Sequence, residues 1–254
     1  MNSPKVSFVI GGAQKCGTTA LASFLGGNAG VRLPDGKEAH VFDLPDFNED
    51  WSAEQVDNLY KGHFGGSFDG GQIFGDATPI YFFHPALVSR IARYNPKMKW
   101  VVLLRHPVER AVSQYHMERR RGHERLPFWL AVVAERFRLK GRWGDLSHGS
   151  PIRVHSYLAR GDYACQLDVL YAHFPAEQVL LLRNDELSQS PDDVMRRVCR
   201  FLGVEPETER LEYSRVFSGG YSPLAKGSFS FRLATLLLWR QMRRAKNEYG
   251  LKWK

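Results

Sequence analysis

Short apolar runs alternate along the chain with segments of helical periodicity. Val6–Ile10 is β-branched and apolar, and Lys99–Arg105 and Gln178–Leu182 are continuous apolar runs typical of buried parallel strands. A further short strand ending in a turn is predicted within 72–79. Helices are predicted after residue 17, at 87–94, from Pro107 onward, and at 163–173, 192–202 and 231–247. This alternation predicts an α/β protein with a P-loop-like, three-layer fold, in which helices flank a central parallel sheet.

Two stretches lack a clear period. Residues 34–57 are acidic and are predicted to be loop-like, whereas residues 118–155 are basic and aromatic and predict a helix followed by irregular loop. Neither stretch has the composition of a linker, and no internal repeat is visible. The chain is therefore expected to form a single domain covering residues 1–254, with a basic amphipathic helix at about 231–247.

Charge and cysteine content restrict the expected class of ligand and the expected cellular compartment. A net charge of +8 favours an anionic ligand, cofactor or surface, although nucleic acid fits this charge equally well. The three cysteines are far apart and show no zinc spacing, which favours a reduced, cytoplasmic protein without disulfides. No signal peptide is visible, and the longest apolar cluster, 233–239, is too short to span a bilayer. A soluble protein is expected.

The first predicted strand leads into a glycine-containing loop, Gly11–Thr19, and then into a helix. Free backbone N–H groups and the dipole at such a helix N-terminus attract an anion. Gly12 and Gly17 have the separation of a nucleotide-binding P-loop, but Thr18 stands where that motif has its lysine, and Lys15 lies inside the loop. Taken alone, the segment is either an imperfect phosphate loop or a glycine-rich turn without a ligand.

The predicted strand Lys99–Arg105 ends in an arginine, whereas a P-loop kinase has at this place the aspartate that holds magnesium. A guanidinium at the end of a strand, as at Arg105, suits a second phosphate, although an ion pair with Glu109 would also explain it. Ser113 lies nearly two turns into the following helix, so a phosphate shared with Arg105 requires a ligand lying along that helix. Two phosphate sites without a metal ligand describe a doubly phosphorylated nucleotide.

Several motifs, in order between about residues 6 and 205, resemble those of the PAPS-dependent sulfotransferases. Residues 13–19 (AQKCGTT) look like the 5′-phosphosulfate loop, and residues 104–115 (LRHPVERAVSQY) look like the 3′-phosphate motif. Residues 37–43 (KEAHVFD) resemble the K-E-x-H-[FY]-F-D block of the heparan sulfate sulfotransferase branch, to which the bacterial members are similar. Residues 75–81 and the turn at 201–204 are similar to two further elements of that branch.

The resemblance implies sulfuryl transfer from PAPS to an acceptor hydroxyl or amine, with release of PAP and without a metal. Because a loose, in-line transition state is expected by analogy with phosphoryl transfer, positioning and charge stabilisation dominate. Lys15 would stabilise the leaving phosphate and the sulfuryl oxygens. The remaining residues that the resemblance assigns to the cofactor are Cys16, Gly17, Thr18 and Thr19 at the 5′ end, and Arg105 and Ser113 at the 3′-phosphate.

Two residues compete for the role of general base. Glu38 matches the base glutamate of the heparan branch, and its pKa is expected to need raising by partial burial unless a contact with the acceptor compensates. His40 is the rival, because cytosolic members of the superfamily use a histidine and histidine titrates near neutral pH. On an extended segment both side chains would face the same side. Without the resemblance, ordinary loop surface explains these two residues as well as a catalytic role does.

Departures from the heparan pattern leave the acceptor open. Ala77 replaces a lysine of that branch and Asp76 replaces the glutamate before it. The loop 218–226 is the nearest counterpart of the cofactor-clamping loop, so that Lys226 is a further candidate for a phosphate, although a solvated lysine is the commoner explanation. The oligomeric state is not encoded.

The expected acceptor is a small molecule, a saccharide or a lipid-linked compound. Four arginines within 119–125, followed by Trp129 and Trp143, suit an anionic sugar, a phenol or a glycolipid, or form a solvated basic face. The segment 232–254 contains seven Lys/Arg and one acidic residue, which allows peripheral membrane contact or packing of its apolar face on the domain. A P-loop kinase or NTPase and a nucleic-acid-binding module remain alternatives, but no groove-reading motif is evident and nucleic acid is not expected as a partner.

Overall fold

The computed structural model describes residues 4–65, 68, 71–206 and 220–253. The chain divides into two compact units. Residues 1–104 and 169–217 form the sheet unit, and residues 105–168 and 218–254 form the helical unit. The predicted single domain stays a prediction. Ser218 and Gly219 of the predicted C-terminal loop lie outside the described residues.

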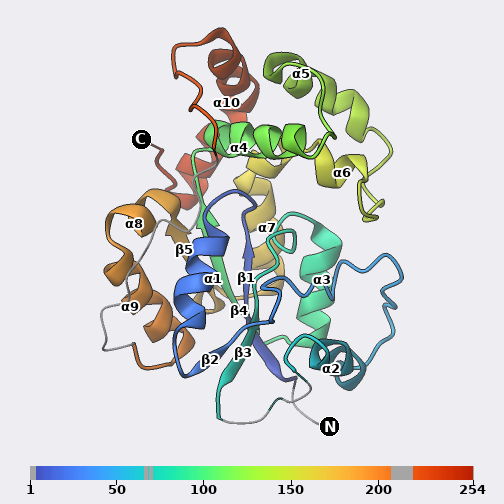
Figure 1. Cartoon of the computed structure of the whole chain (residues 1–254), viewed down its shortest axis with the longest axis vertical. Coiled ribbons are helices and arrows are strands. Elements are labelled where there is room, and N and C mark those ends of the chain that lie inside the picture. Colours follow the sequence, from blue (N-terminus) through green and yellow to red (C-terminus); the bar gives the residue numbers. More distant parts are fainter. Residues whose placement is uncertain (1–3, 66–67, 69–70, 207–219, 254) are drawn as a thin grey trace. The chain divides into compact units, whose positions relative to one another are not determined.

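The sheet unit contains five parallel strands in the order β2-β3-β1-β4-β5 (Figure 1). β1 and β4 are the central pair, and the residues of both are almost entirely buried because their apolar runs are covered on two faces. The predicted central parallel sheet is therefore confirmed. The strands are β1 (Val6–Gly12), β2 (Val31–Arg32), β3 (Ile73–Asp76), β4 (Lys99–Leu104) and β5 (Val179–Arg183).

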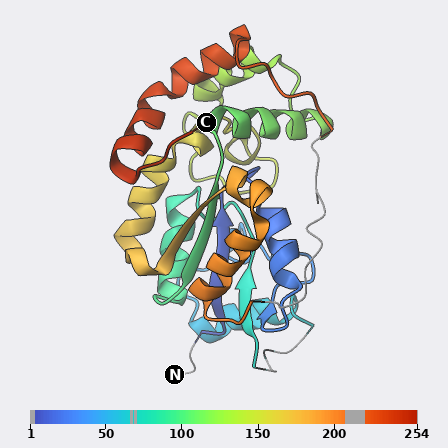
Figure 2. The same cartoon turned by 90° about the vertical axis from the view of Figure 1, so that its left-hand side faces the viewer.

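Helices cover both faces of this sheet. The chain leaves β1 toward the β2 edge through α1 (Thr18–Gly26) but returns from β3 across the sheet to β4 through α3 (Pro85–Tyr94). Because crossovers between parallel strands are right-handed, these two helices lie on opposite faces, as Figure 2 shows. The sheet unit also contains α2 (Ala53–Lys61), the 3-10 helix η2 (Ala176–Gln178), α8 (Asn184–Gln189) and α9 (Pro191–Leu202), and the unit boundary crosses α7 (Tyr163–His173) after Asp168.

One correction concerns the acidic stretch that was predicted to be loop-like. Its last five residues, 53–57, begin α2, which runs to Lys61. Ser52 caps this helix through a capping box, in which its hydroxyl accepts from Gln55 N at 3.3 Å and Gln55 Oε1 accepts from Ser52 N at 2.8 Å. The helix thus depends on its N-terminal cap as much as on apolar periodicity, and periodicity alone overlooks it.

The helical unit is built around three packed helices. α4 begins at Pro107, whose fixed φ and missing N–H suit the first helical position, and α10 begins after Ser228, whose hydroxyl accepts from Phe231 N at 3.3 Å. Among the described residues, no helix of the protein is both long and apolar enough to cross a membrane. The helices are α4 (Pro107–Arg120), α5 (Phe128–Leu139), α6 (Pro151–Val154), η1 (Ala159–Gly161) and α10 (Phe229–Tyr249), and their shared core includes Val108, Val112, Tyr115, Phe128, Tyr157, Phe231 and Leu238.

Candidate functional site

The loop between β1 and α1 has the backbone of an anion site. Gly17 is the N-cap of α1 with φ 97°, and no side chain caps the helix at this end. The first backbone N–H groups of α1 therefore have no acceptor from a capping side chain. A Cβ on Gly17 would lie 2.7 Å from Asn184 Nδ2, so only glycine fits here.

The same loop is held from the sheet side. Asn184 Nδ2 donates to Cys16 O at 2.9 Å, and Ala13 N donates to Leu103 O at 2.7 Å. Cys16 is fully buried and thus shapes the loop from inside, whereas Lys15 is partly exposed and Thr19 exposed. Sequence reasoning overlooked Asn184. The available signal was its place directly after β5, because the carboxyl ends of parallel strands meet at one edge of the sheet.

The two candidate bases meet in one charged network. Glu38 Oε1 lies 2.5 Å from Lys37 Nζ, and Glu38 Oε2 lies 3.2 Å from His40 Nε2. On its other nitrogen, His40 Nδ1 lies 2.9 Å from Oδ2 of Asp43, whose side chain is fully buried. The imidazole therefore bridges two carboxylates, and only one of them, Glu38, is partly exposed, at 33%.

This network sets opposite charge states on Glu38 and His40. Burial raises the pKa of Glu38, but the hydrogen bond from His40 and the charge of Lys37 outweigh it and hold the pKa below the usual value. Burial lowers the pKa of His40, but Asp43 and Glu38 raise it to about 9. At neutral pH Glu38 is thus ionised and His40 is protonated. The pKa of Glu38 is not raised overall, which leaves the second expectation, that a contact with the acceptor compensates. The expectation that His40 titrates near neutral pH is wrong.

A buried carboxylate beneath the network positions the segment 37–40. Asp76 Oδ1 accepts from Ala39 N at 3.2 Å and from the Thr78 hydroxyl at 2.7 Å, and Thr78 Oγ1 in turn accepts from His40 N at 3.3 Å. Asp76 Oδ2 accepts from the hydroxyls of Tyr60 at 3.0 Å and Tyr81 at 2.7 Å. Burial raises the pKa of Asp76 despite these four donors. The sequence marked Asp76 only as a departure from a family pattern.

The backbone of the segment differs from the prediction. Lys37 and His40 have φ of 70° and 55°, so the segment is turned and not extended. Glu38 and His40 still meet, because the turn brings their side chains together. Ala77, which replaces the lysine of the resembling branch, is fully buried, and its N–H donates to Lys37 O at 3.3 Å. The lysine beside Glu38 is Lys37, a residue to which the sequence assigned no role.

The helical unit brings together two of the residues expected at the 3′-phosphate. Arg105 Nε pairs with Glu109 Oε2 at 3.2 Å, so the ion pair considered from the sequence is present. The pKa of His106 is lowered by burial, against the influence of Glu109, and further by the charges of Lys226 and Arg105. Lys226 and Arg105 therefore both lie near the imidazole of His106. Ser113 is 5% exposed on α4, which leaves its hydroxyl little access to a ligand.

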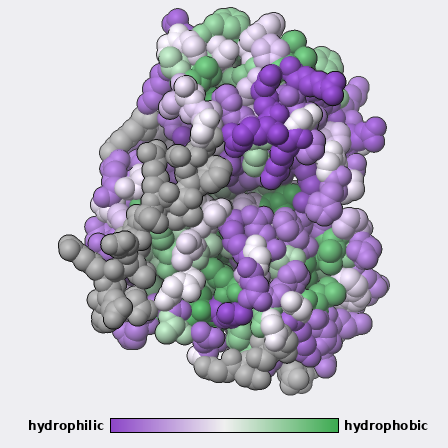
Figure 3. All heavy atoms as spheres, viewed as in Figure 1, coloured by the Kyte–Doolittle hydropathy of each residue, from purple (hydrophilic) through white to green (hydrophobic). Residues whose placement is uncertain are grey.

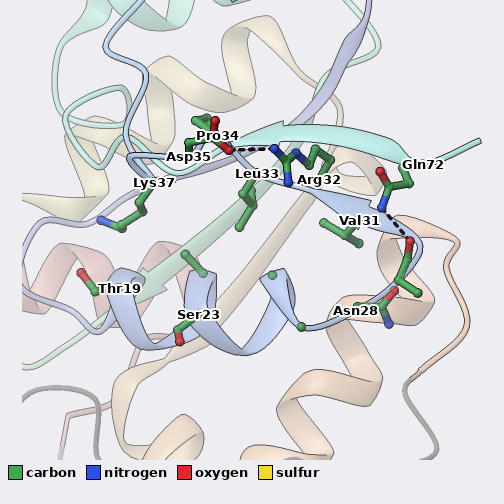
Figure 4. A pocket seen from close by; sticks show the side chains of 14 residues that line it. Thr19, Ser23, Asn28, Val31, Arg32, Leu33, Pro34, Asp35, Lys37 and Gln72 are labelled. Carbon is green, nitrogen blue, oxygen red and sulfur yellow. Dashed lines mark hydrogen bonds and ion pairs between the residues drawn. The ribbon is translucent and has the colours of Figure 1, made fainter. Parts of the chain in front are cut away.

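A groove of about 600 Å³ runs along α1 within the sheet unit. Thr19 and Lys37 lie at one end of the groove, next to the network around Glu38 (Figure 4). One wall of the groove is α1, and Val31 and Leu33 belong to the wall that faces it. Arg32 pairs with Asp35 at 2.7 Å on the same wall. The groove therefore begins where the candidate base lies and continues toward the edge of the sheet.

Comparison with known proteins gives one family. A model described as "Sulfotransferase domain" matches residues 5–215. Heparan sulfate glucosamine 3-O-sulfotransferase 3B1 of Homo sapiens is 31% identical over 197 residues, which cover 78% of this chain and 46% of that protein. Heparan sulfate glucosamine 3-O-sulfotransferase 6 of Mus musculus is 32% identical over 200 residues, covering 78% and 52%. The chain thus spans about half the length of these curated relatives.

The fold has a counterpart among solved structures. A sulfotransferase from Alicyclobacillus acidocaldarius superposes with a TM-score of 0.73 at 27% sequence identity, covering 99% of this chain and 98% of that one. This structural match extends over almost the whole chain, whereas the family model matches residues 5–215.

Proposed function

Because this chain belongs to the family of sulfotransferase domains, we propose that it transfers the sulfuryl group of PAPS to a hydroxyl or amine of an acceptor and releases PAP. PAPS supplies an activated sulfuryl group whose leaving group is a phosphate. The protein then has three tasks: to hold two phosphates, to stabilise charge on the departing phosphate, and to accept the acceptor's proton.

The ionised Glu38 between two cations is the observation that carries the proposal. Its carboxylate accepts the proton of the acceptor hydroxyl while that oxygen forms its bond to sulfur and the sulfur–oxygen bond to the phosphate breaks. A carboxylate with a lowered pKa is a weak base, which suits a loose transition state in which proton loss is late. His40, protonated at neutral pH, orients Glu38 and does not compete for the proton. The charge states therefore favour Glu38 as base and His40 as a positioning residue.

The loop before α1 suits the 5′-phosphosulfate. The N–H groups of Gly17, Thr18 and Thr19 would bind the phosphate, since no capping side chain takes them. Lys15 would stabilise the leaving phosphate, and Cys16 would keep the loop in shape from its buried position. Arg105 and Lys226, whose charges both lower the pKa of His106, would bind the 3′-phosphate, with Ser113 as a secondary contact.

The groove along α1 suits the acceptor. Its two cations, Arg32 and Lys37, each pair with an acidic side chain, Asp35 and Glu38, so its local charge is balanced. A neutral, hydroxylated small molecule, saccharide or lipid-linked acceptor fits this wall better than a polyanion. Heparan sulfate is named for the relatives, but Ala77 stands where the pattern of the heparan branch has a lysine.

The proposed setting is cytoplasmic and metal-independent. Among the described residues all three cysteines are free thiols, and two of them, Cys16 and Cys199, are buried. A kinase or NTPase is disfavoured, because Thr18 stands where the P-loop lysine belongs and Arg105 follows β4 where a magnesium ligand would be needed. A lipid-linked acceptor would add peripheral membrane contact through α10.

Binding and turnover test the proposal separately. Calorimetry without metal should show PAP binding far more tightly than ATP or AMP, and comparable affinities for PAP and AMP would contradict the two-phosphate site. With PAPS and a panel of hydroxylated acceptors, Glu38→Gln should abolish turnover while PAP affinity is retained. If Glu38→Gln stays active and His40→Asn is inactive, the base is His40.

A further inference from the structure

An exposed apolar stripe runs along α5. Trp129, Val133 and Phe137 follow each other at intervals of four residues and are 41%, 42% and 75% exposed. Side chains at this spacing lie on one face of a helix, and the opposite face of α5 carries the buried Phe128, Ala131 and Val132. Three large apolar side chains in one exposed row are unusual for a surface that only water covers.

A second exposed stripe lies on α10 and joins the first. Phe229, Leu236, Leu237 and Trp239 are 68%, 72%, 41% and 52% exposed. The rings of Trp129 and Phe229 are in contact, with centroids 6.3 Å apart at 69°. The two stripes therefore form one surface, the α5–α10 face, and Figure 3 shows hydrophobic residues among strongly hydrophilic ones over these helices at the top of the view.

Cations surround the apolar residues of the α5–α10 face. Arg136 on α5 and Lys140, which directly follows α5, are exposed, and Arg232, Arg240 and Arg243 are exposed on α10. The guanidinium of Arg243 lies 5.4 Å from the ring centroid of Trp239. Long basic side chains around a Trp/Phe/Leu surface are typical of helices that lie in the plane of a membrane interface, where the cations reach the phosphates.

The charge of the protein is concentrated in this unit. The helical unit has 20 Lys/Arg and 8 Asp/Glu, a net charge of +12, whereas the sheet unit has 15 and 19, a net charge of −4. Three of the eight acidic residues, Glu118, Glu124 and Glu135, are buried, which leaves the surface of the helical unit more positive still. An anionic surface therefore attracts this unit and repels the other.

We propose that the α5–α10 face docks on an anionic phospholipid surface. The apolar side chains enter the interface between headgroups and acyl chains, and the surrounding arginines and lysines contact lipid phosphates. A second copy of the chain is a poor occupant, because pairing this face with itself opposes two units of +12. Nucleic acid matches the charge but leaves the apolar row in water. The proposal does not depend on the reaction that the protein catalyses.

Vesicle binding by the full chain tests the proposal. Sedimentation with vesicles of phosphatidylcholine alone is compared with a mixture containing about one third phosphatidylglycerol, at low and high salt. Binding is expected only to the anionic vesicles and is expected to weaken with salt, because each cation near an anionic surface changes the affinity about fivefold. Tryptophan emission should shift to the blue on binding, and this shift should shrink in Trp129→Phe with Trp239→Phe.

Paired variants separate the face from overall charge. Arg240→Glu with Arg243→Glu should weaken vesicle binding at least about 25-fold, two cations at about fivefold each. Arg196→Glu with Arg197→Glu makes the same change of net charge on α9 of the sheet unit and should have a much smaller effect. Phe137→Ser with Leu236→Ser changes the two most exposed apolar side chains, so folding should survive while binding falls.

Several results would overturn the proposal. These are absence of binding to the phosphatidylglycerol vesicles at low salt, equal losses for the two arginine pairs, or unchanged binding in Phe137→Ser with Leu236→Ser. A dimer seen by analytical ultracentrifugation that disappears in the same serine variant would show that a second copy covers the face. Thermal unfolding of each variant confirms that a loss of binding is not a loss of fold.

Discussion

Replacing Asp76 by alanine should detach the segment that carries Glu38 from the sheet. Asp76 is fully buried and accepts four hydrogen bonds, from Ala39 N, Thr78, Tyr60 and Tyr81. Each buried donor left without an acceptor costs about 1 kcal/mol, or about 4 kcal/mol for the four. Removing this buried carboxyl group returns desolvation free energy, taken as about 1 kcal/mol, the lower value for a buried polar group. The net loss of unfolding free energy is therefore about 3 kcal/mol.

That loss has a thermal and a kinetic signature. In a chain of 254 residues each kcal/mol lowers the melting temperature by about 2–4 °C, so Asp76→Ala should melt about 6–12 °C lower. Its turnover number should fall about 100-fold, as expected when a reacting group moves by about 1 Å. The affinity for PAP should hardly change, because the loop before α1 makes none of these hydrogen bonds with Asp76.

Differential scanning calorimetry, PAPS turnover and PAP calorimetry measure these effects on one preparation. Tyr60→Phe removes a single donor from the same carboxylate and should cost about 1 kcal/mol with little loss of turnover. Asp46→Ala, at an exposed acidic position, should stay within about 0.5 kcal/mol of the parent protein. If Asp76→Ala melts like Asp46→Ala and keeps its turnover, Asp76 does not position Glu38.

Four further outcomes are expected. Gly17→Ala should lose PAP affinity and about 1–3 kcal/mol of stability, because alanine disfavours the left-handed backbone and its Cβ clashes with Asn184. Gly26→Ala in α1 is the control and should be neutral or stabilising, because a Cβ there meets no atom within 4 Å. Equal effects of the two variants in calorimetry would refute the role of Gly17. Activity should decline as pH rises through about 9, the raised pKa at which His40 loses its proton. The stability that the protonated His40 contributes is complete below the ordinary histidine pKa of 6.5 and should be lost as pH rises from there through about 9. In His40→Asn the Glu38 pKa should rise, so the acid limb of the pH–rate profile should move up; an unmoved limb would separate the two residues. Chelation of divalent metals should leave PAPS turnover unchanged, and a loss restored by magnesium would contradict a metal-independent site.

The sequence was sufficient wherever one physical signal dominated. Continuous apolar runs identified β1, β4 and β5, because strands buried on both faces need them. Helix α10 extends two residues beyond its predicted limits at each end, within the usual uncertainty of helix boundaries. The two-residue strand β2 carries no periodic signal, since two residues cannot show a period of two.

The sequence indicated which residues of the candidate site lie close together better than it indicated their geometry. The motif named Glu38 and His40, but the positive φ of Lys37 and His40 places two non-glycine residues in a conformation that no local pattern encodes. The charge states depend on Asp43 and Lys37, whose proximity arises only in the folded turn. Partial burial suggested a raised Glu38 pKa, and the neighbouring cations reversed that direction.

The edge position of β2 has a consequence for how this protein can diverge. Val31 and Leu33, on the groove wall opposite α1, belong to a two-residue strand at the margin of the sheet and to the loop after it, whereas the Asp76 network is rooted in β3. Edge segments and loops accept substitutions that a buried hydrogen-bond network does not. Lineages descended from this fold can therefore exchange side chains at the proposed acceptor wall while the proposed base, Glu38, stays in place.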